Sequence, residues 1–559
     1  MKNKFLITFS FAAIMIAVGI ITLQGCSKKL DSAYLNPNNP VEGGLETILP
    51  NVINQMTSTA APPAGGGGGS YGPAAESVLM ARYIQYWAEV SSANANISYD
   101  QMGGVYGTTS DNTGLVWAMH YYGIGPNAKY IISRGIEQQK WDYVGVAHAI
   151  FAFSWLTLTE EYGDAVILKE AFDGGRDAFD YDPQTMVYDT VRVICDNAIA
   201  YLSRTDGAVS PTELAKGDSY FYGGDVAKWK KFVYGIKARS FAHLSNKSFY
   251  ASKGYADSVI KYCDLSLATN ADNAVQKWQG GAFSGTNNYY GPFRGNIGSI
   301  RQTSFIADLL SGASTQSPFT TIFDPRTPYL INENEVGKYR GIEPGKGSTG
   351  FATQDLPKNF WRAVYSSTGT TADSGRYIFN NLAPFPVLTA SDIQFMKAEA
   401  AFRKGDKALA LAAYTKGIDL SFDMLQTTYE GRIPTVSKIT PATKAAYMSD
   451  PRVIPATGAA LTLTQIMLQK YIALYGYGFN ETWTDMRRFH YTDLDPATGK
   501  QVYAGFSLPT PLNSFNQGKP VYRARPRYNS EYLYNIPSLQ SVGALASDYH
   551  TKEQWFSQP

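Results

Sequence analysis

The sequence predicts a mostly helical protein: a scaffold of paired helices, with long irregular loops and little β structure. Apolar residues recur with the 3.6-residue period of a helix in several segments along the chain. Small residues and a Gly-Asp turn join two of these segments near the middle of the chain. Other stretches, roughly 270–300, 310–390 and 495–530, are rich in Gly, Pro, Asn, Thr and Tyr without any period, which is typical of long ordered loops.

The composition indicates a globular chain that does not bind nucleic acid. Hydrophobic residues make up 44% of the 559 residues, which is enough for a large core. Charged residues make up only 17%, and the formal net charge is +2, so the basic surface that nucleic acid requires is not expected. Aromatic residues reach 14%, including 39 Tyr; such rings can stack on the apolar faces of a ligand, or they can pack the helices and loops.

The N-terminal segment is typical of an exported lipoprotein. Lys2 and Lys4 precede an apolar run, which ends in Leu23-Gln24-Gly25-Cys26 and resembles a lipobox. We therefore expect a signal peptide over 1–25, acyl chains (palmitate among them) on Cys26, a flexible tether over 26–73 and a single domain over 74–559. An uncleaved membrane anchor is the alternative, because the apolar run is long enough to span a bilayer.

Four stretches place apolar residues on one face of a helix. The apolar stripes are Leu79, Tyr83, Tyr86 and Val90; Val187, Val191, Ile194, Ala198 and Leu202; Trp229, Phe232, Val233 and Ile236; and Leu468, Ile472, Tyr475 and Phe479. Asp225 is the expected N-cap of the helix that contains Trp229, because an aspartate side chain can accept the first free backbone N–H groups of a helix.

One helix pair has a more specific pattern, near 393–422. Small residues and Tyr414 follow one another at spacings of 7, 5, 4 and 3 from Ala398 to Gly417, with Gly405 at the turn. This pattern resembles one tetratricopeptide repeat, in which small residues lie where two antiparallel helices touch. A capping box of Ser391 and Gln394 is expected to start the first helix.

Cys195 and Cys263 both lie in apolar helical patterns. In an exported protein they could form a disulfide or remain two buried thiols, and their spacing does not decide between these.

No catalytic or metal site is predicted. The serine in Gly68-Gly69-Ser70-Tyr71-Gly72 lacks the preceding strand that a nucleophile elbow needs, and the five histidines are scattered. The many carboxylates leave a glycan-active hydrolase as an alternative, because the separation of a carboxylate pair is a three-dimensional quantity. We expect a protein that is not an enzyme and has no cofactor besides lipid; whether a structural calcium is bound stays open.

Several short strings, taken in order, resemble the SusD/RagB family of surface lipoproteins from Bacteroidetes. Most of their residues are expected to be structural, with Trp229 and Trp483 in the core and Arg487-Arg488 in ion pairs with Glu481 and Asp485 along one helix. The strings are Asn36-Pro37-Asn38-Asn39-Pro40, Tyr162-Gly163-Asp164, Gly224-Asp225, Asp324-Pro325-Arg326, Ala398-Glu399-Ala400, Gln469-Lys470-Tyr471, Glu481-Thr482-Trp483 and Arg527-Tyr528.

This resemblance implies a nutrient-binding lipoprotein of the outer membrane that faces the cell exterior. Its ligand would be an oligosaccharide, or less often a peptide, and its partner a SusC-type TonB-dependent transporter. A hydrolase and a tetratricopeptide-type scaffold for protein interactions are the alternatives. The resemblance places the ligand surface in the loop after the first long helix and in mid-chain loops, at Asn94, Asn96, Tyr99, Tyr106, Tyr289, Tyr290, Phe293, Arg294 and Trp361.

Overall fold

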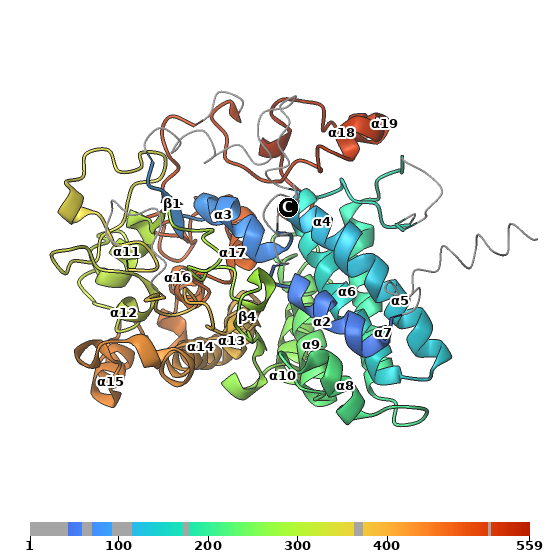
Figure 1. Cartoon of the computed structure of the whole chain (residues 1–559). Helices are drawn as coiled ribbons and strands as arrows, with labels where there is room; N and C mark the ends of the chain where they lie inside the picture. Colours follow the sequence, from blue (N-terminus) through green and yellow to red (C-terminus); the bar gives the residue numbers. More distant parts are fainter. Residues whose placement is uncertain are drawn as a thin grey trace, which may run out of the picture.

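The computed structural model describes residues 43–58, 70–91, 114–169, 171–172, 178–362, 373–512 and 516–559. Helices dominate these residues, which confirms the predicted fold class (Figure 1). The helices are α2 (Leu45–Gln55), α3 (Pro73–Tyr83), α4 (Leu115–Ala118), α5 (Gly125–Glu137), α6 (Trp141–Tyr162), α7 (Gln184–Leu202), α8 (Pro211–Asp218), α9 (Val226–Ala242), α10 (Tyr255–Leu265), α11 (Ser304–Ser311), α12 (Thr327–Leu330), α13 (Ala390–Lys404), α14 (Lys407–Thr428), α15 (Pro441–Ser449), α16 (Leu463–Ala473), α17 (Phe479–Arg488), α18 (Glu531–Tyr534) and α19 (Ile536–Ser541).

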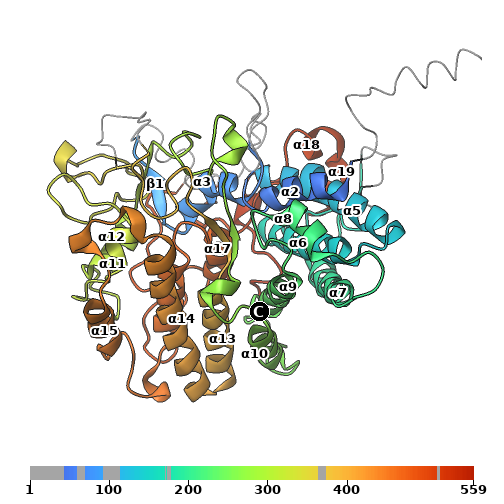
Figure 2. The ribbon, with the colours of Figure 1, turned by 60° about the horizontal axis from the view of Figure 1, so that its bottom comes forward.

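The longer helices form a continuous array. Helix α5 packs on α6, α6 on α7, α7 on α9, α9 on α10, α10 on α13, and α13 on both α14 and α16. Helices α5 to α10 lie on one side of the molecule in Figure 1 and α11 to α16 on the other, with α3 and α17 between them. Figure 2 shows α10, α13 and α14 side by side. None of the helices in the described ranges has the length and apolar character of a membrane span.

The predicted helix pair near 393–422 is confirmed as α13 and α14. Gly405 ends α13 with a φ of +91°, a conformation that favours glycine. The Asp406 side chain then accepts the Leu409 N–H at 3.0 Å and starts α14. The predicted cap of α13 is wrong: Thr389, two residues earlier than Ser391, accepts the N–H of the third helical residue.

Four short strands form two antiparallel pairs, β1 (Trp87–Glu89) with β3 (Ile300–Gln302) and β2 (Ala274–Gln276) with β4 (Phe385–Leu388). The sequence predicted that the helix with Leu79 and Tyr83 continues to Val90, and this prediction is wrong beyond Tyr83, where α3 ends. Gln85 has a φ of +58°, which turns the chain out of α3, and Trp87 then pairs with Gln302. Tyr86 and Val90 are buried as the pattern indicated, but they flank the strand β1 instead of lying on a helix.

The predicted tether over 26–73 is wrong for residues 45–58. Helix α2 packs on α5 and α8, and Leu49 and Val52 are fully buried in the main core. The reason is the apolar stretch around 48–53, which gives an 11-residue helix enough buried surface to join the domain. The signal peptide and Cys26 lie outside the described residues.

Other core predictions are confirmed. Trp229 and Trp483 have no exposed surface, and the apolar stripe of α7 is buried throughout. Asp225 accepts the Lys228 N–H at 3.0 Å as the N-cap of α9. Cys195 and Cys263 are free buried thiols, so they do not form the disulfide that their spacing left open. Burial raises the pKa of the Cys195 thiol to about 12.

Candidate functional site

The residues predicted to bind ligand divide into three groups. Asn94, Asn96, Tyr99 and Tyr106 lie outside the described residues. Phe293 is 51% exposed, and Arg294 is half-buried beside it. Tyr289, Tyr290 and Trp361 are buried.

Tyr290 is a core residue in a segment without helical period. Its hydroxyl lies 2.5 Å from the Ser77 hydroxyl on α3, and its ring meets Trp87 edge-on at 5.7 Å between centroids. Its backbone carbonyl accepts the indole N–H of Trp361 at 2.7 Å. Tyr289, Tyr290 and Trp361, which the resemblance placed at the ligand surface, are therefore buried, because this loop packs onto α3 and β1 and its rings fill the space between them.

Arg294 joins the same loop to the segment before α3. Its guanidinium donates to the Ser284 carbonyl at 3.1 Å and to the Ser70 hydroxyl at 2.9 Å, and it lies 5.1 Å from the Tyr289 ring centroid. Burial lowers the pKa of Arg294, and the nearby Tyr289 opposes this only in part. Arg294 therefore helps to hold the loop in place.

Phe293 places an aromatic ring of this loop in solvent. Its backbone N–H donates to the Asn381 Oδ1 at 3.0 Å, and Gly291 approaches the same residue so closely that a Cβ there would lie 2.7 Å from the Asn381 Cα. The loop is thus fixed on both sides of an exposed ring. A fixed apolar ring is suited to stack on the apolar face of a sugar, because little freedom is lost on binding.

A second candidate site is a network of charged side chains buried between five helices. Its members come from segments that are far apart in the sequence, and all are at least nine-tenths buried. They are Glu160 on α6, Arg239 on α9 and His243 just after it, Asp392 and Glu399 on α13, Lys470 on α16, and Glu481, Asp485 and Arg488 on α17.

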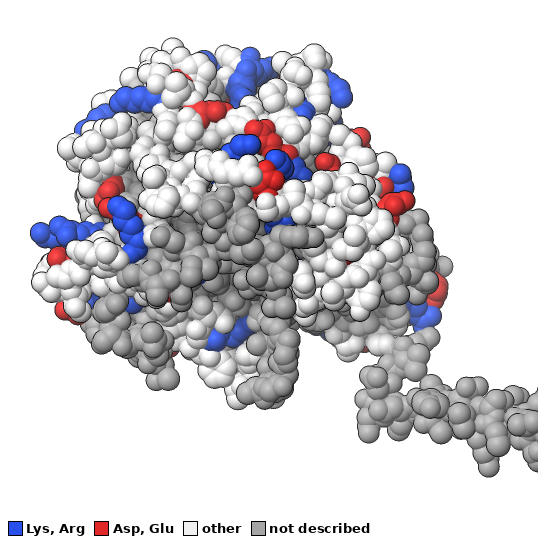
Figure 3. Space-filling view, turned by 90° about the horizontal axis from the view of Figure 1, so that it is seen from above, with Lys and Arg blue, Asp and Glu red and all other residues white. Residues whose placement is uncertain are grey.

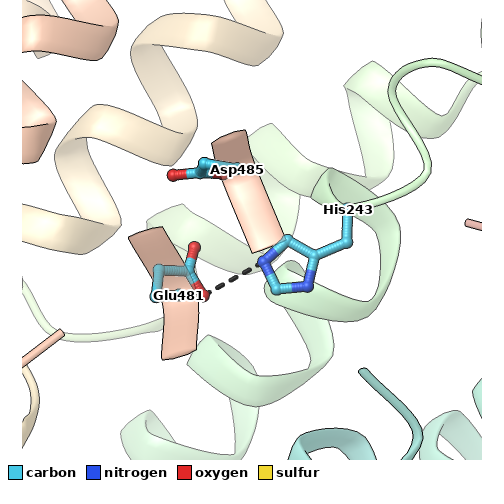
Figure 4. A group of neighbouring side chains, drawn as sticks. All are labelled: His243, Glu481 and Asp485. Atoms are coloured by element: carbon cyan, nitrogen blue, oxygen red, sulfur yellow. Dashed lines mark hydrogen bonds and ion pairs between the residues drawn. The ribbon is translucent and has the colours of Figure 1, made fainter. Parts of the chain in front are cut away.

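His243 lies between the carboxylates of Glu160 and Glu481, and Figure 4 shows its contact with Glu481. Its Nδ1 contacts Glu160, and its Nε2 lies 3.0 Å from the Glu481 Oε2. Burial alone would lower the pKa of His243, but the two carboxylates outweigh burial and raise it to about 9. The imidazole is therefore a cation at neutral pH that donates from both nitrogens.

The geometry of this network fits ion pairs rather than a metal. His243, Glu481 and Asp485 bring one possible ligand atom each within 4.8 Å of one another. However, the Lys470 Nζ lies 2.7 Å from the Glu481 Oε1 and 2.8 Å from the Asp485 Oδ2. The Arg239 Nε lies 3.0 Å from the Glu481 Oε2. Because these cations already hold the carboxylate oxygens, we assign no metal here.

The sequence predicted only part of this network. The pairing of Arg488 with Asp485 along α17 is confirmed at 2.5 Å, and Arg488 also holds the Glu399 carboxylate with two contacts of 2.8 and 2.9 Å. Arg487 was predicted to form an ion pair as well, but it donates to the backbone carbonyl of Glu160 at 2.6 Å. Burial lowers the pKa of Arg487 to about 10.

A family model for SusD-like proteins, described as starch-binding and associating with the outer membrane, matches residues 37–510. The chain belongs to the SusD-like family. None of the curated proteins matches this sequence.

Solved structures share the SusD-like fold at low sequence identity. A SusD/RagB family protein from Bacteroides thetaiotaomicron is 20% identical with a TM-score of 0.63, covering 92% of this chain and 99% of its own. A chitin-binding SusD homologue from Flavobacterium johnsoniae is 17% identical with a TM-score of 0.63, covering 92% and 98%. A further chitin-binding protein is 19% identical with a TM-score of 0.59, covering 86% and 95%.

Proposed function

We propose that this SusD-like chain binds an oligosaccharide at the outer surface of the outer membrane and delivers it to a SusC-type TonB-dependent transporter. The family match over 37–510 carries the proposal, because that family is described as starch-binding and associated with the outer membrane. The chitin-binding relatives support a glycan rather than another nutrient.

The described part of one face of the molecule supports a neutral ligand. In the view of Figure 3, Lys, Arg, Asp and Glu side chains are sparse and of both signs, and most of the described surface carries neither charge. Phe293 adds an exposed ring on a fixed loop. Sugars present apolar ring faces and hydroxyl groups, so they are recognised by stacking and hydrogen bonds rather than by net charge.

The lipid on Cys26 and the cleavage of residues 1–25 belong to the same proposal. If Cys26 carries the anchor, Cys26→Ala moves the protein from the membrane fraction to the soluble fraction. Unchanged membrane attachment would favour an uncleaved anchor. Protease treatment of whole cells tests exposure at the exterior, because a surface protein is cut while the cells stay intact.

A glycan and peptide array with the purified chain tests the binding function. We expect binding signals for one or more oligosaccharides. We also expect the bound oligosaccharides to be recovered without hydrolysis. Binding of peptides alone would overturn the choice of ligand. Hydrolysis that is lost on changing one Asp or Glu would favour a hydrolase, and recognition of a protein with no glycan signal would favour a scaffold.

A further inference from the structure

The loop that carries Phe293 rests on one residue of a neighbouring segment, Asn381, which lies shortly before β4. The Asn381 Oδ1 accepts the Phe293 backbone N–H at 3.0 Å, and the Asn381 carbonyl accepts the Asn288 N–H at 2.9 Å. Gly291 lies so close that a Cβ there would be 2.4 Å from the Asn381 Oδ1. Three positions of the loop therefore contact Asn381, and its side-chain oxygen holds the position that bears the exposed ring.

Asn381 is held in turn by Asp373. The Asn381 backbone N–H donates to the Asp373 Oδ1 at 3.2 Å. The Asp373 Oδ2 lies 3.0 Å from the Arg432 Nη2, and the Arg432 Nη1 donates to the Asp373 backbone carbonyl. Arg432 ends the short helical turn Glu430–Arg432, which follows α14. A continuous series of contacts thus runs from the end of α14 to the backbone of Phe293.

These contacts restrict the position of the loop more than they stabilise the fold. The Arg432 and Asp373 side chains are 38% and 28% exposed, and ion pairs with such exposure typically contribute little to folding. However, the planar guanidinium contacts both the carboxylate and the backbone carbonyl of Asp373, so it fixes the side chain and the backbone together. An exposed ring needs this support, because binding is weaker when the ring is misplaced or must first be ordered.

We propose that Asn381 and Asp373 are positioning residues for the Phe293 ring and act on the ligand only through that ring. The proposal rests on the proposed function, because it takes Phe293 as a contact for the oligosaccharide. If the two residues served the fold alone, their loss would lower the melting temperature and leave the affinity of the folded chain unchanged.

Alanine variants, each made alone and together with Phe293→Ala, separate these roles. Asn381→Ala removes the side-chain contact with Phe293 and keeps the backbone contacts of residue 381. Asp373→Ala removes the acceptor of the Asn381 N–H and the carboxylate partner of Arg432.

Asp206→Ala is the matched control, because Asp206 likewise pairs with a partly exposed arginine, Arg204, in the turn after α7. Each full chain is applied to the glycan array and titrated with maltohexaose and chitohexaose. Thermal melts confirm that each variant is folded at the temperature of the titration.

We expect Asn381→Ala and Asp373→Ala each to bind the oligosaccharide about three- to tenfold more weakly than the wild type, while Asp206→Ala binds with unchanged affinity. In chains that also carry Phe293→Ala, neither change should weaken binding further, because the ring through which both residues act is gone.

The assignment is overturned, and the proposed function stands, if the wild type binds glycans and either Asn381→Ala or Asp373→Ala binds them equally well. A loss of affinity that persists beside Phe293→Ala overturns it as well, since the residue would then act independently of the ring. If the wild type binds no glycan on the array, the proposed function fails and this assignment fails with it.

Discussion

The interior of the helical frame and the loop that carries Phe293 differ in where charged and uncharged side chains lie. Between α6, α9, α13, α16 and α17, charged side chains are buried and joined into one network. In the loop, Tyr289 and Tyr290 fill the core, whereas the Phe293 ring reaches solvent. The charged residues that carried the family resemblance therefore hold helices together, whereas the exposed contact proposed for the ligand is uncharged.

The two regions should also respond differently to substitution. In the network each charge is removed from water and depends on its partners, so loss of one leaves the others unpaired. Phe293 contributes little to packing, because half of its surface is exposed. Changes in the network should therefore alter stability, and changes at Phe293 should alter ligand affinity.

The largest expected effect is that of Glu481→Gln. Glu481 contacts Lys470, Arg239 and His243, and removal of its charge from this buried group should lower the free energy of unfolding by about 3–5 kcal/mol. Urea denaturation measures the change. Glu213→Gln is the control, because Glu213 forms an exposed pair with Lys216 and its loss should leave the unfolding midpoint unchanged. Equal midpoints for both variants would show that the network does not stabilise the frame.

A smaller effect is expected from the protonation of His243. Its pKa in the folded chain is about 9, above the unfolded value of 6.5, so its stabilising contribution is complete below about pH 6.5 and is lost as the pH rises toward and through 9. The loss should be about 3 kcal/mol for a shift of this size. NMR of the histidine rings should find His243 still protonated at pH 8. A neutral His243 at that pH would contradict the assigned ion pairs.

Tyr290→Phe should have a smaller effect on stability than either of these changes. It removes the hydroxyl that contacts Ser77 while keeping the buried ring, so a loss of about 1 kcal/mol is expected from one buried hydrogen bond. Thermal unfolding measures this, and Tyr290→Ala, which also removes the ring, should cost about 3–5 kcal/mol. If Tyr290→Ala left the melting temperature unchanged, Tyr290 would not be part of the core.

The features that were predicted correctly depend on residues that are close together in the sequence. The α13–α14 pair follows from helical period, small contact residues and the Gly405-Asp406 turn, all within about 40 positions. The burial of Tyr290 and the position of His243 depend on partners far along the chain: Ser77 is 213 positions from Tyr290, and Glu481 is 238 positions from His243. No local sequence pattern indicates contacts between residues so far apart. The Tyr-rich loop was therefore expected at the surface, and the buried charged network was predicted only for its residues on α17.

The most direct test of the whole account is the affinity of Phe293→Ala for the best oligosaccharide on the array. Isothermal titration should show binding weaker than wild type by about 1–3 kcal/mol, because one exposed ring contributes part of a stacking surface, while the melting temperature stays unchanged. Tyr290→Phe, titrated in parallel, should keep wild-type affinity. Unchanged affinity in Phe293→Ala would contradict the assignment of this loop to the ligand.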